Sequence, residues 1–162
     1  MLKIATWNVN GIRAREAQVL EWIERERPDV VCLQELKSTV AQVPAALCEL
    51  QGYRCYWHGA RAYSGVGLHI RRDAFADEPQ FRHPSFDVET RIVTAQVGDF
   101  LFVSVYVPNG GKDFLAKMEF LRQMETFTIH ASHCRPARCI VSSNPQIRHE
   151  CRVVFFAGRT GN

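Results

Sequence analysis

Several features are absent from this sequence of 162 residues. It contains no apolar run of about 18 residues, the length that a helix needs to cross a membrane. The first residues also lack the layout of a signal peptide, because Lys3 is followed at once by a strand-like pattern. Internal repeats and low-complexity segments are missing as well. These absences exclude a helical membrane protein and predict one soluble cytoplasmic domain, since 46% apolar content suffices for a sizeable core.

Neither cysteine pairing nor a strong global charge marks the chain. The six cysteines form no Cys-x-x-Cys pair and no zinc-finger spacing with histidine, so they are predicted to be reduced thiols. The net charge is +3, but five arginines and a single acid, Glu150, follow Ile129, which leaves 15 basic and 16 acidic residues in positions 1–129. Because this main body is near neutral, any binding of nucleic acid must depend on a local patch.

Strand-like and helix-like patterns alternate along the chain. Helix 114–127 is the clearest of them and places Phe114, Met118, Leu121 and Met124 on one face. The patterns predict strands over 2–9, 30–33, 53–57, 65–70, 91–97 and 101–107, and further helices over 15–27 and 44–50. This order indicates a mixed α/β layer fold without choosing among several.

Two segments end an apolar strand in polar groups that suit a metal ion and a phosphate. They are Thr6-Trp7-Asn8-Val9-Asn10-Gly11-Ile12-Arg13-Ala14 and Val30-Val31-Cys32-Leu33-Gln34-Glu35-Leu36-Lys37. Hydrolysis of a phosphodiester requires neutralisation of the phosphate charge and an aligned water. Magnesium serves this purpose through one or two carboxylates and the substrate phosphate, so Glu35 beside the amide of Asn8 is a plausible ligand set. Taken singly, Glu35 also fits a solvated carboxylate and Asn8 a turn residue.

Together the two segments resemble the opening of the endonuclease/exonuclease/phosphatase superfamily, in the form found in its exonuclease III and abasic-site endonuclease branch. The resemblance implies an α+β fold, the DNase I-like four-layer α/β sandwich, of which this chain covers roughly the first half. It also implies that Glu35 binds Mg²⁺, with Mn²⁺ an alternative, and that Asn8 helps to hold the metal-binding carboxylate or the phosphate. Asn10 and Arg13 are expected to contact DNA.

Three further segments are similar to family motifs. Tyr63-Ser64-Gly65-Val66-Gly67 resembles a segment in which small residues let the backbone approach closely. Glu89-Thr90-Arg91-Ile92-Val93 resembles the place where the family sets an arginine against DNA, although Arg91 also fits a surface cation. Tyr106-Val107-Pro108-Asn109 resembles a motif whose Tyr and Asn face the scissile phosphate, and Tyr106 also fits a core residue with its hydroxyl at the rim.

The resemblance fails after about Met124. Where the family has Gly-Asp-x-Asn, this chain has Ser143-Asn144-Pro145-Gln146, so Asn144 stands at the position of the catalytic Asp and Gln146 at that of the phosphate-binding Asn. A neutral amide does not accept the proton that a carboxylate takes. The Ser-Asp-His segment that carries the family's catalytic His also has no counterpart. We therefore divide the chain into residues 1–129, the N-terminal half of a family domain, and residues 130–162, a divergent or frame-shifted tail.

Two functional hypotheses follow. The first is a DNA-repair nuclease like exonuclease III, which hydrolyses phosphodiesters at abasic sites or 3′ ends of double-stranded DNA. The second is a catalytically inactive remnant that retains at most DNA or partner binding; whether the chain is an enzyme stays open. A third, a phosphatase of small phosphoesters, is disfavoured by the Asn-Gly-Ile-Arg-Ala signature. Family members are monomers, but half of a sheet sandwich is expected to leave the inner face of one sheet uncovered and to promote self-association.

Overall fold

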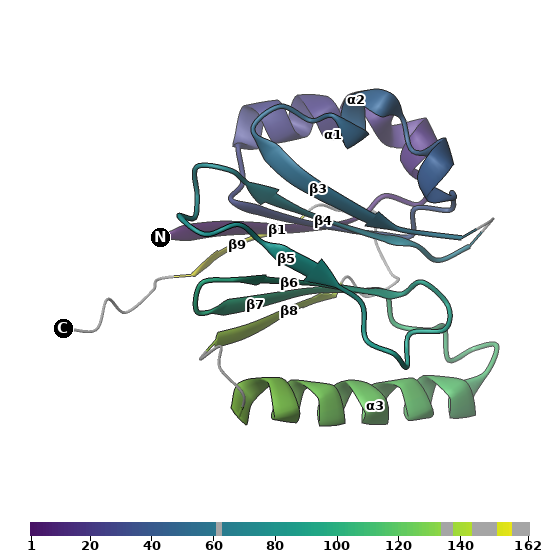
Figure 1. Ribbon diagram of the computed structural model, residues 1–162. Helices are drawn as coiled ribbons and strands as arrows, with labels where there is room; N and C mark the ends of the chain where they lie inside the picture. The colour runs from purple at the N-terminus through teal and green to yellow at the C-terminus, as the bar shows by residue number, and fades with distance from the viewer. Residues whose placement is uncertain (61–62, 134–137, 144–151, 157–162) are drawn as a thin grey trace.

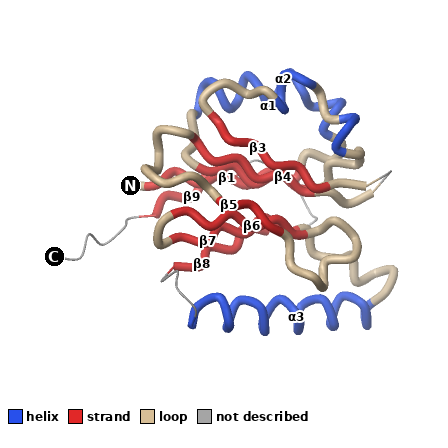
Figure 2. Tube along the Cα trace, viewed as in Figure 1, coloured by secondary structure: helices blue, strands red, loops and turns tan. Residues whose placement is uncertain are grey.

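The computed structural model describes residues 1–60, 63–133, 138–143 and 152–156. Its two sheets lie face to face, and helices cover the outer face of each (Figures 1 and 2). The layer order is thus helix, sheet, sheet, helix, which confirms the predicted α+β four-layer sandwich.

The first sheet has the strand order β3-β4-β2-β1-β9. Its strands are β1 (Leu2–Asn8), β2 (Val30–Gln34), β3 (Tyr53–His58), β4 (Val66–Arg71) and β9 (Arg152–Phe156). Strands β1 and β2 are parallel, in a register that pairs Asn8 with Gln34. Strand β2 is buried on both faces, because Val31 and Leu33 face the helices whereas Val30 and Cys32 face the other sheet. This double burial explains why its sequence is continuously apolar.

Helix α1 (Ile12–Glu26) connects β1 to β2 and covers the outer face of the first sheet. Its buried stripe consists of Ile12, Val19, Trp22 and Ile23. Arg27 caps the C-terminus of the helix: its backbone is left-handed (φ 43°), and its N–H donates to the carbonyl of Ile23. The short helix α2 (Ala45–Cys48) follows a 3-10 turn, η1 (Val40–Gln42), and lies on the same face.

The second sheet has the order β5-β6-β7-β8. Its strands are β5 (Gln80–Arg82), β6 (Ile92–Val97), β7 (Phe100–Val105) and β8 (Arg138–Ser143). Strands β6 and β7 form the predicted hairpin around a Gly98-Asp99 turn. Strand β8 is parallel to β7, and the long helix α3 (Phe114–His133) joins the two.

Apolar residues of the two sheets interlock between them and close the central layer. Val66, Leu68 and Ile70 of β4 meet residues of β6 and β7 such as Val93 and Phe102, all at most 1% exposed. The expectation that one inner sheet face lacks its partner is therefore wrong. Residues 1–105 already supply strands to both sheets, so each inner face covers the other.

Helix α3 packs on the second sheet through a face that the periodicity did not identify. Phe120, Met124 and Phe127 contact the outer side of β6 and β7, whereas Phe114 and Met118 are 63% and 47% exposed. Of the four residues grouped by spacing, only Met124 is buried, and Leu121 is 37% exposed. A helix with apolar residues around much of its circumference does not reveal by spacing alone which side meets the sheet.

Two strands of the segment after residue 130 join the sandwich. Strand β8 lies beside β7, and β9 runs antiparallel to β1. Asn144 and Gln146, at the positions of the family's catalytic and phosphate-binding residues, lie outside the described residues. Within the described part of the chain, no helix is both long and apolar enough to cross a membrane.

Candidate active site

The predicted site residues gather at one end of the paired sheets. Asn8 ends β1, Glu35 follows β2 directly, and Tyr106 follows β7. The parallel pairing of β1 and β2 brings the carboxyl ends of both strands to the same edge, where ligands commonly bind in α/β sheets. Hydrogen bonds from the N–H groups of Gly11 and Ile12 to the carbonyls of Glu35 and Leu36 (2.8 and 3.0 Å) fasten the two post-strand segments together.

Both carboxylate oxygens of Glu35 are held by neighbouring side chains. Nδ2 of Asn8 donates to Oε2 at 2.8 Å, and Nζ of Lys37 lies 2.9 Å from Oε1. Asn8 is 3% exposed, and its Oδ1 accepts the N–H of Asn10 at 3.1 Å, so the amide has a single orientation. Nζ of Lys37 also donates to Oδ1 of Asn10. Asn8 thus aims its side-chain nitrogen at Oε2 of Glu35.

The backbone around Glu35 is strained and is held by the neighbouring loop. Glu35 and Lys37 both have left-handed conformations, with φ of 61° and 51°. Such a conformation costs a non-glycine residue about 1 kcal/mol. The N–H groups of Leu36 and Lys37 donate to the carbonyls of Gly65 and Ser64 at 3.2 and 3.0 Å. The segment with small residues before β4 therefore fixes the conformation that presents Glu35.

The donor set fits a hard cation that keeps most of its waters. Among the described residues, no group of three or more His, Cys, Asp or Glu side chains is placed to enclose a metal ion. A single carboxylate suits Mg²⁺, which typically binds through one or two carboxylates plus waters and substrate phosphate. Glu35 would hold the ion, and the ammonium group of Lys37 lies next to the same carboxylate.

A cavity of about 440 Å³ opens next to Glu35. It is lined by residues from both sheets and from the start of α3: Glu35, Lys37, Tyr63, Ser64, Glu89, Arg91, Tyr106, Pro108, Asn109, Lys112, Asp113 and Ala116. Two larger hollows, of about 600 and 590 Å³, lie elsewhere and contain none of the predicted site residues. We assign the site to the smaller cavity because four predicted residues converge there.

Arg91 and Tyr106 form one unit in the wall of this cavity. The guanidinium carbon of Arg91 lies 5.2 Å from the centre of the Tyr106 ring, a cation–π distance. Nε of Arg91 contacts Oε2 of Glu89 at 2.6 Å, and the Tyr106 N–H donates to the Arg91 carbonyl at 2.8 Å. Only 11% of the Arg91 side chain is exposed, unlike that of an isolated surface cation. The pair presents a positive group and a phenol to the same space.

The remaining predicted residues surround this centre. Asn109 lines the cavity, and its Oδ1 accepts the N–H of Gly111 at 2.9 Å. Asn10 lies beside Lys37, and Arg13 is exposed in the first turn of α1. Motif reasoning assigned no role to Lys37, although it lies two residues after Glu35 in the motif itself. It also missed Glu89 and Lys112, which become site residues only because their loops meet the cavity.

Comparison with known proteins identifies the family of this chain. The model of the Endonuclease/Exonuclease/phosphatase family matches residues 5–154. The chain belongs to this family. The match extends past Met124 and includes β8 and most of β9.

The relatives of this endonuclease/exonuclease/phosphatase family chain include DNA-repair nucleases. It is 34% identical over 116 residues to "DNA repair nuclease APEX1" of Danio rerio, a match that covers 68% of this chain and 37% of the relative. It is 29% identical over 135 residues to exodeoxyribonuclease III of Haemophilus influenzae, covering 78% and 51%. The structure of a variant of the Neisseria 3′ phosphatase NExo bound to a product DNA hairpin superimposes with a TM-score of 0.76 at 28% identity, covering 87% of this chain and 56% of that one. The chain thus spans about half or less of the length of these relatives.

Proposed function

We propose that this chain carries a DNA-directed phosphodiester site of the exonuclease III type, which uses Mg²⁺ or Mn²⁺ and acts on double-stranded DNA at abasic sites or 3′ ends. The observation that carries the proposal is the contact between Asn8 and Glu35 at the mouth of a cavity that also contains Arg91, Tyr106 and Asn109. Had the amide and the carboxylate pointed apart, no shared site would exist. The DNA-repair relatives support the same substrate class.

Each residue has a task in this proposal. Glu35 would hold the metal ion, which when bound neutralises phosphate charge. Arg91 binds a phosphate oxygen through its charged N–H groups, and the Tyr106 hydroxyl and Asn109 amide contact the same phosphate. Lys37 keeps Glu35 oriented and adds positive charge near the phosphate. Together these groups bind and orient the substrate, which is the larger part of phosphoester catalysis.

A second candidate, a binding protein without turnover, has its own supporting observation. Every carboxylate that lines the described cavity already has a structural partner: Glu35 has Asn8 and Lys37, Glu89 has Arg91, and Oδ1 of Asp113 accepts the N–H of Ala116 at 2.9 Å. With Asn144 in place of the family's Asp, this candidate predicts DNA binding without cleavage.

One experiment separates the candidates. A 5′-labelled duplex with one abasic site is incubated with the chain, with Mg²⁺ or with EDTA, and cleavage and anisotropy are recorded in parallel. We expect duplex binding that weakens with salt, and any cleavage should require Mg²⁺ and disappear in Glu35→Gln. Glu119→Gln, which changes an exposed carboxylate on α3, is the matched control. Cleavage that survives in Glu35→Gln would contradict the assigned site, and absence of both binding and cleavage would refute both candidates.

We also propose a cytoplasmic, monomeric protein. The four described cysteines, Cys32, Cys48, Cys55 and Cys139, are free thiols, which supports a reducing compartment. The mutual cover of the two sheets removes the physical reason for self-association that the sequence suggested. The molar mass measured by light scattering at several protein concentrations tests this proposal, and it should stay at the value of one chain.

A further inference from the structure

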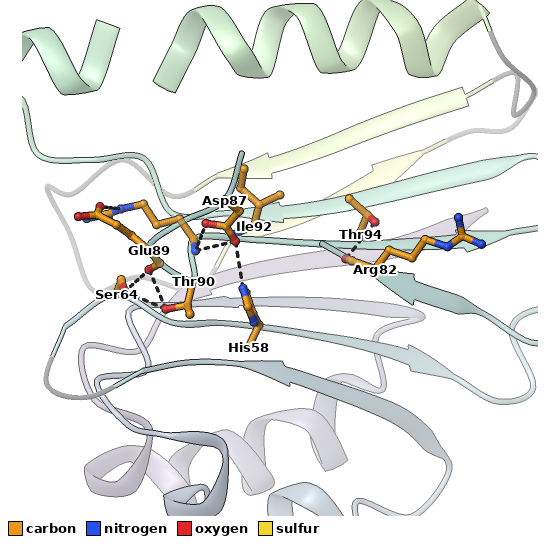
Figure 3. Close-up of polar contacts among 9 residues, drawn as sticks. His58, Ser64, Arg82, Asp87, Glu89, Thr90, Ile92 and Thr94 are labelled. Carbon is orange, nitrogen blue, oxygen red and sulfur yellow. Dashed lines mark hydrogen bonds and ion pairs between the residues drawn. The ribbon is translucent and has the colours of Figure 1, made fainter. Parts of the chain in front are cut away.

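The turn before β6 joins the two sheets at the active-site end through one buried carboxylate. The side chain of Asp87 is 1% exposed. Its oxygens accept the N–H of Arg91 at 2.8 and 3.0 Å. They also accept the N–H of Ile92 at 2.8 Å and a hydrogen bond from Nε2 of His58 at 3.1 Å (Figure 3). His58 ends β3 in the first sheet, whereas Asp87 lies just before β6 in the second. The contact therefore clamps one sheet to the other.

The same turn is also held from its other side. Oγ of Ser64 donates to the Glu89 carbonyl at 2.6 Å and lies 3.1 Å from Oγ1 of Thr90 (Figure 3). The Gly65 N–H donates to the Thr90 carbonyl at 3.1 Å. Thr90 has φ of 55°, a left-handed conformation that a β-branched residue rarely adopts. A turn with this much strain keeps its shape only while its surroundings impose it.

This turn presents Glu89 and Arg91 to the cavity, and Arg91 is the cation of the two. Its N–H is fixed by Asp87, and its carbonyl accepts the N–H of Tyr106. A shift of Asp87 would therefore move the guanidinium and the tyrosine together. The ring of His58 is itself held by stacking on His83, with centres 4.3 Å apart and planes 9° from parallel. Burial alone would raise the pKa of Asp87, but the hydrogen bonds from His58, Arg91 and Ile92 lower it, so the acceptor remains charged.

We propose that His58 and Asp87 are positioning residues, which act through the backbone of Arg91 to place its guanidinium and Tyr106 against the substrate phosphate. The inference rests on the proposed DNA-binding function and deepens it. Neither residue lines the cavity, so neither touches substrate. Their role is to preorganise groups that do.

A double-mutant cycle on DNA binding tests this role. The probe is a duplex with a tetrahydrofuran abasic analogue, in EDTA, measured by anisotropy well below the unfolding temperature. We expect Arg91→Ala to weaken binding about tenfold and His58→Leu three- to tenfold, and the double variant to bind no more weakly than Arg91→Ala alone. His58→Gln retains a donor at the place of Nε2 and should bind within about twofold of the unchanged chain.

Two controls separate positioning from general destabilisation. Asp73→Asn changes an exposed carboxylate beside Arg71, at the opposite end of the sheets, and should leave binding unchanged. Thermal unfolding of every variant shows which fraction is folded during the assay. His58→Leu removes one hydrogen bond to Asp87 and the stacking on His83, but it leaves the backbone contacts of Asp87 in place, so it perturbs the fold less than a substitution of Asp87 would.

The outcomes are distinct. Independent, multiplicative effects of His58→Leu and Arg91→Ala, or equal loss in His58→Leu and His58→Gln, would overturn the positioning role while leaving the proposed function intact. An unchanged chain that does not bind the duplex at all would instead refute the proposed function.

Discussion

The buried histidine of β4 allows a quantitative prediction about stability. His69 is 1% exposed and packs against the Trp57 ring, with centres 4.5 Å apart. Neither Nδ1 nor Nε2 has a hydrogen-bond partner among the described residues. Burial lowers the pKa of His69 from 6.5 to about 3, because a charged imidazole would lose its solvation there. His69 thus carries two unsatisfied polar atoms in the buried layer, next to the unsatisfied Nε1 of Trp57.

Replacing His69 by Leu should stabilise the chain at neutral pH and reduce its acid sensitivity. Each unsatisfied buried polar group destabilises the folded chain by about 1–3 kcal/mol, and removing both nitrogens relieves this cost. The imperfect fit of a side chain of similar size destabilises the variant by about 1.5 kcal/mol at most. We therefore expect the free energy of unfolding of His69→Leu to exceed that of the unchanged chain by about 0.5–6 kcal/mol at pH 7.

The pH dependence follows from the lowered pKa of His69. Below about pH 6.5 the His69 imidazole is protonated in the unfolded chain, whereas in the folded chain it stays neutral down to about pH 3. The free energy of unfolding of the unchanged chain is therefore unaffected by His69 protonation above pH 6.5, and it falls as the pH is lowered from 6.5 to 3. Each pH unit in that window costs about 1.4 kcal/mol, so the advantage of His69→Leu should grow by about 2 kcal/mol between pH 7 and pH 5.

Urea unfolding followed by circular dichroism at pH 7 and pH 5 measures both effects. His130→Leu, which replaces an exposed histidine on α3, is the matched control. Parallel loss of stability in His69→Leu and the unchanged chain between the two pH values would refute the assigned protonation behaviour. A less stable His69→Leu at pH 7 would show that the imidazole nitrogens are satisfied.

Two further predictions concern polar contacts near the site. Gln34 is fully buried; it accepts a hydrogen bond from Oγ1 of Thr6 (3.2 Å) and donates one to Oγ of Ser104 (3.4 Å) in the other sheet. Gln34→Met should therefore lower the free energy of unfolding, measured with urea, by about 1–3 kcal/mol. Equal stability would show that these two contacts contribute nothing. Lys37 forms a partly exposed ion pair with Glu35, worth about 0.2–1 kcal/mol, and so competes with a metal ion for this carboxylate. Lys37→Met should therefore tighten Mg²⁺ binding up to about fivefold in calorimetric titration. Weaker binding would contradict this competition.

Much of the site was predictable because its motifs are local. Glu35 and Tyr106 each follow an apolar run that reads as a strand. Their placement at strand ends can therefore be predicted without knowing how the strands are arranged in space. The partners that orient these groups were not predictable in the same way. His58 and Asp87 are 29 residues apart and meet only because two different sheets face each other. The position of Asp87 four residues before Arg91 was the one local signal, and it is also common in ordinary turns.

The sequence by itself indicated six of the nine strands and all three α-helices that the structure describes, and that the chemistry of residues 8 and 35 suits a cation and a phosphate. Local periodicity and short motifs suffice for this, because they depend on neighbours within a few residues. Only the tertiary structure decided that both sheets cover each other, that Phe120, Met124 and Phe127 form the buried face of α3, and that a lone imidazole lies unsatisfied in the described core. These outcomes depend on which element lies opposite which, and that pairing arises from long-range packing that no local pattern encodes.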